Sequence, residues 1–289
     1  MLSDSWLPIG ELARRTGVNP VTLRAWERRY GLLVPERTPK GHRLYSEAHV
    51  ARVEDILHWL ERGASVGQVR ELLDRQADTP PLLQGDWHDR CQRLIDAVAN
   101  LAPRSLDQQL NQAMALYPAL TLCEQLLLPL LDSLEQRWRN HIDARLEQAL
   151  FHTWLRSKLG ARVYHDTQSL EGPPILLVTD NDQPLDEHLW LCAWLLSSSG
   201  FAVQVLERPV GGKQLQQAVA RLAPKALVLF LGARLEADKL LALQEIDIPK
   251  LLGGTTVSLH EARVQAQRIA RLQLFDKPQG ALRLLQQSR

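Results

Sequence analysis

Hydrophobic residues near the N-terminus recur at the spacing of a short amphipathic helix. Ile9, Leu12 and Ala13 lie three and four positions apart, which predicts a helix over residues 7–17 that ends at Gly17. The residues between these positions are mostly polar or charged. One face of this helix is therefore expected to be buried and the other solvated.

A second short helix is predicted directly after the first. Asn19 is a favoured N-cap, because its side chain accepts a hydrogen bond from an otherwise unpaired backbone N–H, and Pro20 suits the first helical position. The helix is expected to run from about Pro20 to Tyr30 and to stop at Gly31. Two short helices joined by a tight turn form a helix-turn-helix.

The segment 32–45 lacks helical spacing and is interrupted by prolines and glycine, which predicts a small hairpin wing with a basic tip. Helices are expected to follow Ser46 and Ser65, since serine is a favoured helix cap. Residues 76–81, Gln-Ala-Asp-Thr-Pro-Pro, have the composition of a linker. We therefore expect a winged helix-turn-helix domain over residues 1–77.

A long stretch of helical periodicity follows and predicts a second domain over residues 82–168. Its apolar runs cover residues 94–101, 106–116, 120–138 and 142–159. Helices of this number and length indicate a four-helix bundle.

From residue 172 onward, short apolar runs alternate with helical patterns. Strands are expected at 175–179, 201–206, 226–232, 250–254 and 273–275, and helices at 187–199, 213–222, 236–243, 260–269 and 280–287. Such alternation implies a parallel sheet covered by helices on both faces. The expected fold class is multidomain: a winged helix-turn-helix, a four-helix bundle, and a doubly wound α/β domain with a five-stranded parallel sheet over residues 172–289.

The composition, with 45% hydrophobic and 23% charged residues among 289, is ordinary for a soluble globular protein. No apolar run approaches the roughly 18 residues that a membrane helix needs, and the first residues lack the pattern of a secretory signal. The cysteines, Cys91, Cys123 and Cys192, are far apart, which favours free thiols in a reducing compartment. We therefore expect a cytoplasmic protein without membrane contact.

The formal net charge of +1 hides a local concentration of positive charge. Between residues 14 and 43, eight basic residues face two acidic ones, a balance of 8 − 2 = +6. The basic residues are Arg14, Arg15, Arg24, Arg28, Arg29, Arg37, Lys40 and Arg43. A cationic surface on an otherwise balanced chain indicates a nucleic-acid footprint.

The second helix is expected to enter the major groove of DNA, where the residues of its N-terminal half reach base edges. Its candidate base contacts are Thr22, Arg24 and Arg28, and the two arginines are four residues apart on one face. Phosphate contacts are expected from Arg29, Arg37, Lys40, His42, Arg43 and Tyr45, and Arg14 and Arg15 complete the candidate DNA-binding surface. Leu23 and Trp26 are expected in the core.

Several motifs in this region resemble the N-terminal domain of MerR-type transcriptional regulators. They are Ile9-Gly10-Glu11-Leu12-Ala13, Thr16-Gly17-Val18, Thr22-Leu23-Arg24-x-Trp26-Glu27 and Gly41-His42-Arg43-Leu44-Tyr45-Ser46. The run Trp26-Glu-Arg-Arg-Tyr30 resembles a sub-branch that includes MlrA-like regulators and cobalamin-dependent light-responsive repressors. The resemblance implies a nucleoid-associated homodimer or homotetramer that binds a pseudo-palindromic operator in double-stranded DNA and acts on RNA polymerase at the promoter.

The C-terminal half resembles the cobalamin-binding module of the same sub-branch. That module carries a Glu/Asp-x-His-x-x-Gly motif after its first strand, and the histidine ligates cobalt. Alignment by helix length places the motif at residues 183–188, so Leu185 takes the ligand position and His188 the glycine position. Leucine has no lone pair for a metal, so we expect neither cobalamin nor another metal.

A second family motif, Trp followed after nine residues by Glu-His, covers the upper face of cobalamin. Trp138 is present, but Gln148 and Ala149 follow, or Glu147 and Gln148 with a one-residue gap. Gly253 and Gly254 match a position near the nucleotide tail of the cofactor. The candidate pocket for a different ligand consists of Trp138, Gln148, His188, Gly253 and Gly254.

Three roles are open for this half: homo-oligomerisation, contact with a partner protein, and binding of a small effector such as a cyclic dinucleotide in the crevice beyond the strand ends. Residues 211–213, Gly-Gly-Lys at a helix start, are either a phosphate site or an ordinary loop. The rival functions are a cobalamin-responsive light sensor, an adaptor, and a cobalamin- or nucleotide-dependent enzyme. We expect no enzyme, because we find no Ser/His/Asp set, Walker A loop or metal-ligand spacing. The operator, the target genes, the sign of regulation and the effector stay undecided.

Overall fold

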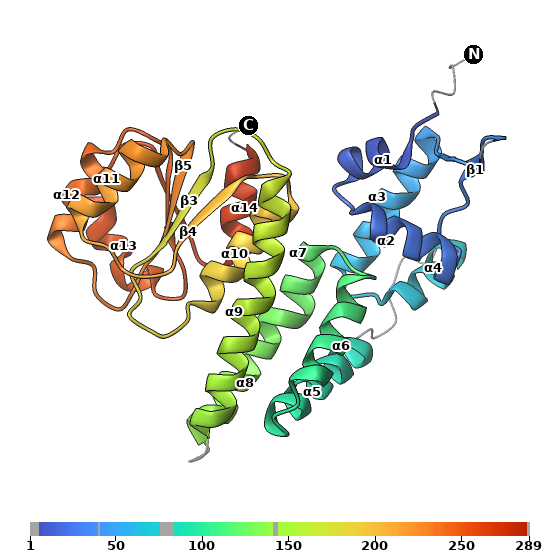
Figure 1. Ribbon diagram of the computed structural model, residues 1–289, viewed down its shortest axis with the longest axis horizontal. Coiled ribbons are helices and arrows are strands. Elements are labelled where there is room, and N and C mark those ends of the chain that lie inside the picture. Colours follow the sequence, from blue (N-terminus) through green and yellow to red (C-terminus); the bar gives the residue numbers. More distant parts are fainter. Residues whose placement is uncertain (1–5, 40, 76–83, 141–143, 288–289) are drawn as a thin grey trace. The chain divides into compact units, whose positions relative to one another are not determined.

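The computed structural model describes residues 6–39, 41–75, 84–140 and 144–287, which form two compact units, residues 1–148 and 149–289 (Figure 1). Each unit is described by itself. Lys40 and the expected linker at 76–81 lie outside the described residues. The domain boundaries expected from the sequence, near residues 77–82 and 168–172, stay predictions.

The first unit begins with the expected helix-turn-helix. Helix α1 (Ile9–Thr16) ends at Gly17, whose φ of 71° is the left-handed conformation that glycine adopts without strain. Helix α2 (Pro20–Ala25) starts at Asn19, whose side chain accepts the Val21 N–H at 2.8 Å. The helix continues as a wider π-helical turn, η1 (Trp26–Tyr30), which the periodicity did not predict, and ends at Gly31.

A two-stranded antiparallel wing follows, formed by β1 (Glu36–Arg37) and β2 (Arg43–Leu44). The Gly41 N–H donates to the Thr38 carbonyl at 2.8 Å and closes the turn at the wing tip. Helices α3 (Glu47–Glu61) and α4 (Val66–Arg75) complete the winged helix-turn-helix. Apart from the π-helical turn η1, the elements of this region are those that the sequence predicted.

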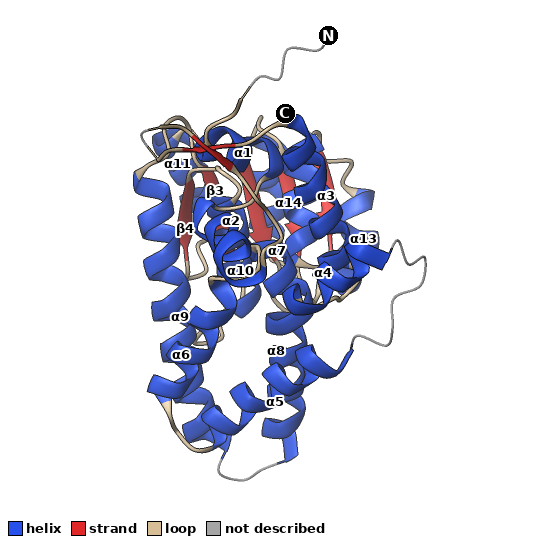
Figure 2. Cartoon of the chain, turned by 90° about the vertical axis from the view of Figure 1, so that its right-hand side faces the viewer, coloured by secondary structure: helices blue, strands red, loops and turns tan. Residues whose placement is uncertain are grey.

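The rest of the first unit is helical (Figure 2). It contains α5 (Gln84–Ala99), α6 (Pro103–Met114), α7 (Ala119–Leu122), a π-helical turn η2 (Cys123–Leu127) and α8 (Leu128–Asn140). Helix α5 starts at Gln84, close to the start expected for the helical domain at residue 82, and its mostly polar first turns precede the apolar run at 94–101. Helix α9 (Ala144–Gln168) crosses the division between the units.

The second unit is a doubly wound α/β fold with five parallel strands in the order β4-β3-β5-β6-β7. The strands are β3 (Ile175–Thr179), β4 (Val203–Leu206), β5 (Ala226–Phe230), β6 (Lys250–Gly253) and β7 (Leu272–Phe275). They alternate with α10 (Glu187–Ser198), α11 (Gly212–Leu222), α12 (Ala237–Glu245), α13 (Val257–Ala266) and α14 (Pro278–Gln287). This confirms the expected fold class.

The sheet is covered by helices on both faces (Figure 1). Helices α11, α12 and α13 cover one face and pack Leu215, Leu240, Leu243 and Val264 into its core, while α10 and α14 cover the other. Every residue of α10 from Leu189 to Ser197 is buried, because α9 covers its outer side. The three-layer core explains why the central strands β3 and β5 read as continuous apolar runs.

Candidate DNA-binding surface and ligand crevice

The helix formed by α2 and η1 has one buried and one outward face. Leu23, Ala25 and Trp26 are buried, whereas Arg28 and Arg29 are exposed and Arg24 is partly exposed. The side chains of these three arginines form no hydrogen bond or ion pair with any other residue that the structure describes. They are therefore available to a polyanion.

Two candidate DNA contacts belong to the core instead. Thr22 is 2% exposed, because its position on α2 turns it towards the core with Leu23. Tyr45 is 0% exposed and packs edge-on against His49, and burial raises the pKa of its phenol. We therefore correct both from surface contacts to buried residues.

Glu27 joins the helix formed by α2 and η1, called the recognition helix below, to the wing. Its carboxylate accepts hydrogen bonds from the Arg43 Nε at 2.6 Å and from an Arg37 guanidinium nitrogen at 3.3 Å. The Glu27 side chain is only 12% exposed, and its hydrogen bond raises the pKa of Arg43. Both strands of the wing are thus held to one carboxylate on the helix.

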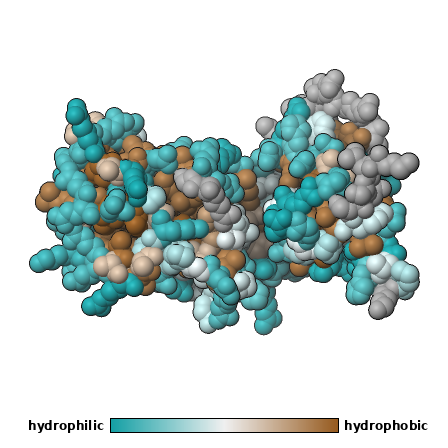
Figure 3. Space-filling model, turned by 90° about the horizontal axis from the view of Figure 1, so that it is seen from above, coloured by the Kyte–Doolittle hydropathy of each residue, from teal (hydrophilic) through white to brown (hydrophobic). Residues whose placement is uncertain are grey.

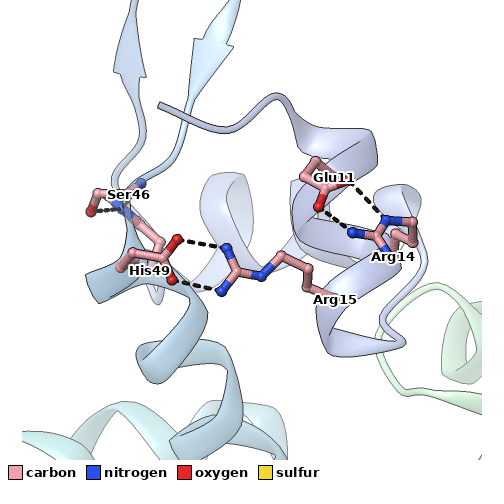
Figure 4. Close-up of polar contacts among 6 residues, drawn as sticks. Glu11, Arg14, Arg15, Ser46 and His49 are labelled. Atoms are coloured by element: carbon pink, nitrogen blue, oxygen red, sulfur yellow. Dashed lines mark hydrogen bonds and ion pairs between the residues drawn. The ribbon is translucent and has the colours of Figure 1, made fainter. Parts of the chain in front are cut away.

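Arg14 and Arg15 are also paired within the winged region (Figure 4). Arg14 binds Glu11 one turn earlier on α1, and Arg15 donates two hydrogen bonds of 2.6 Å to Glu47 at the start of α3. Arg14 and Arg15 are both exposed, so these pairs reduce the local positive charge without removing either guanidinium from the surface. In the same view the Ser46 backbone N–H donates to His49 Nδ1 at 3.0 Å and fixes the start of α3.

The winged region is bonded to the helices that follow it in the same unit. The Trp26 indole N–H donates at 2.8 Å to the carbonyl of Leu116, which follows α6, and Trp26 is 0% exposed. The Trp87 indole on α5 donates to the Gly63 carbonyl at 3.0 Å and its ring lies 4.5 Å from that of Tyr117. The core position expected for Trp26 is confirmed, and it links the recognition helix to the residues that follow α6.

In the second unit, a ligand crevice would be expected where the strand order reverses, between β3 and β5. The loops after these strands close on one another there: the Asp180 N–H donates to the Phe230 carbonyl at 2.8 Å, and a Cβ at Gly232 would lie 2.3 Å from the Asp180 carbonyl oxygen. Lys239 of α12, whose side chain is 4% exposed, forms an ion pair with the Asp180 carboxylate. The chain's own backbone and side chains thus fill this point.

The loop that aligns with the cobalt-ligand motif of the resembling family is used for local structure. Leu185 is 6% exposed and apolar. The next residue, Asp186, caps α10: one carboxylate oxygen accepts the Leu189 N–H at 3.0 Å and the other accepts the Thr179 hydroxyl at 2.7 Å. His188 lies in the first turn of α10 and is partly exposed. The residues here do not fit a group that needs an axial nitrogen ligand in this loop.

Next to this loop, α9 contacts the start of α10 through His152 and Glu187, whose Nε2 and Oε1 atoms are 2.7 Å apart. Burial by itself would raise the pKa of the Glu187 carboxyl, but the hydrogen bond and charge of His152 lower it overall. This contact stabilises α9 against the start of α10.

The five candidate pocket residues are divided between the units. In the first, the Trp138 indole donates to the Glu147 carboxylate at 3.2 Å, which Arg137 also binds, and Gln148 is exposed. In the second, Gly253 and Gly254 are buried, and a Cβ at Gly253 would lie 1.9 Å from the Phe275 carbonyl oxygen. Close packing against Phe275 is therefore enough to require glycine at position 253, whether or not a ligand binds nearby. The pocket formed by the five candidate residues stays a prediction.

The start of α11 supports the loop interpretation of residues 211–213. An Asp238 carboxylate oxygen accepts the Gly212 N–H at 2.9 Å. A Cβ at Gly212 would lie 2.4 Å from the Asp238 carbonyl oxygen. A carboxylate of the chain itself therefore occupies the position that a phosphate would take.

Across the described residues, no three His, Cys, Asp or Glu side chains are grouped as a metal site needs, and no helix is long and apolar enough to span a membrane. Hydrophilic residues cover much of the visible surface (Figure 3). The three cysteines are buried free thiols. Burial raises the pKa of Cys123 to about 12.

Sequence reasoning missed the role of Glu27, which it counted only as an opposing charge. An acidic residue inside a basic recognition helix was the available signal, but its partners, ten and sixteen residues away, depend on the wing. It also missed the exposure of Val21 at the start of α2, because α2 is too short for a periodic pattern to define its faces.

Comparisons with known proteins agree with this architecture. Residues 7–76 match the model for the MerR HTH family regulatory protein, and residues 90–161 match the model for a B12 binding domain. The HTH-type transcriptional regulator MlrA of Escherichia coli is 34% identical over 200 residues, which cover 68% of this chain and 78% of that protein. The HTH-type transcriptional repressor CarH of Myxococcus xanthus is 26% identical over 279 residues, covering 86% and 89%.

A solved structure, the methanol:cobalamin methyltransferase complex MtaBC from Methanosarcina barkeri, covers 76% of this chain and 88% of its own at 14% identity. Its TM-score of 0.33 is too low to carry an argument about the fold. The assignment therefore depends on the helix-turn-helix, on the match at residues 7–76 and on the MlrA relative. Together they show that the chain belongs to the MerR family of helix-turn-helix transcriptional regulators.

Proposed function

We propose that this DNA-binding transcriptional regulator reads its operator with Arg24 and Arg28 and works without cobalamin. The observation that carries the first part is the set of outward arginines on α2 and η1 without partners among the described residues. A guanidinium can bind guanine through two hydrogen bonds, each such pair contributing roughly 1–3 kcal/mol of discrimination.

Phosphate contacts come from the residues around this helix. Arg29 and His42 are exposed, and Arg37 and Arg43 lie on the wing within reach of solvent. Contacts to phosphate position the protein without reading sequence. We propose that a homo-oligomer binds a pseudo-palindromic operator and so controls access of RNA polymerase to the promoter.

The absence of cobalamin is proposed from the second unit. Leu185 supplies no axial nitrogen, and the switch point between β3 and β5 is filled by the Lys239–Asp180 ion pair and the close approach at Gly232. The C-terminal half then serves oligomerisation, a partner protein or a different effector, such as a cyclic dinucleotide, and not catalysis. The known relatives named above are transcriptional regulators or repressors.

Binding of the full chain to its own upstream DNA and to a scrambled duplex, at two salt concentrations, tests the regulatory function. We expect a strong preference for the upstream DNA and an affinity that falls steeply with salt, as release of counterions from phosphates requires. Equal, weak binding to both duplexes would contradict sequence-specific recognition by the chain alone.

Two arginine variants test the division of roles. Arg24→Ala should weaken binding to the preferred duplex more than binding to the scrambled one, because it removes a base contact. Arg29→Ala, an arginine of the same helix, should weaken both about equally and make the salt dependence shallower. Identical profiles for the two variants would overturn the assignment.

A cobalamin-responsive repressor is the second candidate, favoured by the match of residues 90–161 to a B12 binding domain. Titration of the purified chain with cobalamin, followed by absorbance, separates the two. We expect no stoichiometric complex. A tight complex would mean that the chain holds the cofactor without a histidine at position 185.

A further inference from the structure

The outward stripe of the recognition helix begins with an apolar residue. Val21 is 57% exposed, although the residues around it on α2, Thr22 and Leu23, are 2% and 0% exposed. Single exposed apolar side chains are common on protein surfaces. Val21 differs from such cases because Arg24, three residues later on the same helix α2, lies next to it on the helix surface.

The position of Val21 is held by the local structure. It is the second residue of α2, and its backbone N–H donates to the Asn19 side chain at 2.8 Å. The first turn of the helix is therefore ordered before any contact with DNA. Residues in this first turn of a recognition helix face base edges when the helix lies in the major groove.

The chemistry of valine limits what it can recognise. Its side chain has no donor or acceptor, so it cannot bind the polar edges of guanine, cytosine or adenine. The apolar group that the major groove presents is the 5-methyl group of thymine. A β-branched side chain also has few rotamers, so it loses little entropy when it packs on a methyl group.

We propose that Val21 reads the 5-methyl group of a thymine in a base pair next to the one that Arg24 contacts. The inference rests on the proposed function, because it assumes that α2 enters the major groove. It assigns to Val21 the base-reading place at the start of α2 that buried Thr22 does not fill.

The test uses duplexes that the full chain selects from a random-sequence pool. Each thymine of the preferred duplex is replaced singly by deoxyuridine, which removes only the methyl group. For the wild-type chain, we expect one thymine per half-site at which the replacement weakens binding about fourfold, the contribution of one methyl group leaving water. For Val21→Ala, the same replacement should have no effect.

A matched control is Val34→Ala, which removes the same atoms from a valine that is 78% exposed and lies outside α2. This variant should keep the wild-type deoxyuridine profile. Because alanine has the better helix propensity, Val21→Ala should not unfold α2. Thermal unfolding of both variants verifies this.

Each outcome separates the two proposals. A selected sequence whose deoxyuridine profile is the same in wild type and Val21→Ala would overturn the role of Val21 and leave the regulatory function intact. Failure to select any sequence would overturn both. Loss of the methyl effect in Val34→Ala as well would show that the effect does not come from a contact of Val21.

Discussion

The carboxylate of Glu27 holds both strands of the wing to the recognition helix, and its neutralisation is the most informative single change. Glu27→Gln keeps the shape of the side chain and one accepting oxygen but removes the charge that binds Arg43 at 2.6 Å and Arg37 at 3.3 Å. The perturbation therefore weakens the ion pairs without creating a cavity.

The magnitude follows from burial. Hydrogen bonds to a charged group contribute about 1.5–3 kcal/mol, and the pair with Arg43 is the stronger one, since the two side chains are 12% and 24% exposed. The Arg37 side chain is 56% exposed, so solvent screens most of its attraction to the Glu27 carboxylate. Because glutamine retains one acceptor, we expect a loss of about 1–2 kcal/mol and a fall in Tm of about 3–6 °C.

The effect on DNA binding has a defined sign. Arg37 and Arg43, once released from the Glu27 carboxylate, can bind phosphates of any sequence more strongly, because no neighbouring negative charge opposes the contact, so the affinity for scrambled DNA should rise. The wing is then less well oriented. The ratio of specific to non-specific affinity should therefore fall by about fivefold, equivalent to roughly 1 kcal/mol.

Glu36→Gln provides the matched control, because Glu36 is a wing carboxylate that forms no ion pair with the described residues. It makes the same change in charge and should raise non-specific affinity slightly while leaving Tm and the specificity ratio unchanged. Anisotropy titrations with the two duplexes and a thermal scan measure all three quantities. Indistinguishable values for the two variants would refute the positioning role of Glu27.

Three further outcomes follow from buried contacts. Trp26→Phe removes the donor to the Leu116 carbonyl and should lower the free energy of unfolding by about 2–3 kcal/mol in urea; a loss below about 0.5 kcal/mol would contradict this. The hydrogen bond and charge of His152 lower the pKa of Glu187 from its ordinary value of 4.5. This contribution to stability is complete above that pH and is lost as the pH falls through the lowered pKa, so the stability gap between wild type and His152→Ala should shrink on acidification below about pH 4.5. A gap independent of pH would argue against it. Since burial raises the pKa of Cys123 to about 12, iodoacetamide at pH 8 should label it much more slowly in the folded chain than in urea, and equal rates would disprove its burial.

Local sequence signals were enough to predict most elements. The Asn19 cap, the stop at Gly31 and the alternation of apolar runs after residue 172 each depend on neighbours within a few positions. Helix α5 begins at Gln84, within the helical stretch expected from residue 82, although its first turns are mostly polar. Residues whose backbone conformation is set locally are thus the ones that a sequence identifies reliably.

Which side chains face DNA, and which crevice is filled, was decided by tertiary structure. Thr22 and Val21 are adjacent in a short helix, and only packing of α2 against the core shows that the first is buried and the second exposed. Glu27 binds Arg43, sixteen residues later in the chain, and the Asp238 carboxylate accepts the N–H of Gly212, twenty-six residues earlier, at the start of α11. The sequence by itself determined the helix-turn-helix, the α/β alternation and the leucine at the expected ligand position. The exposed surface of α2 and η1 and the filled point between β3 and β5 depend on contacts between residues far apart in the chain. The sequence lists the residues that are present, but the tertiary structure decides which of them come into contact.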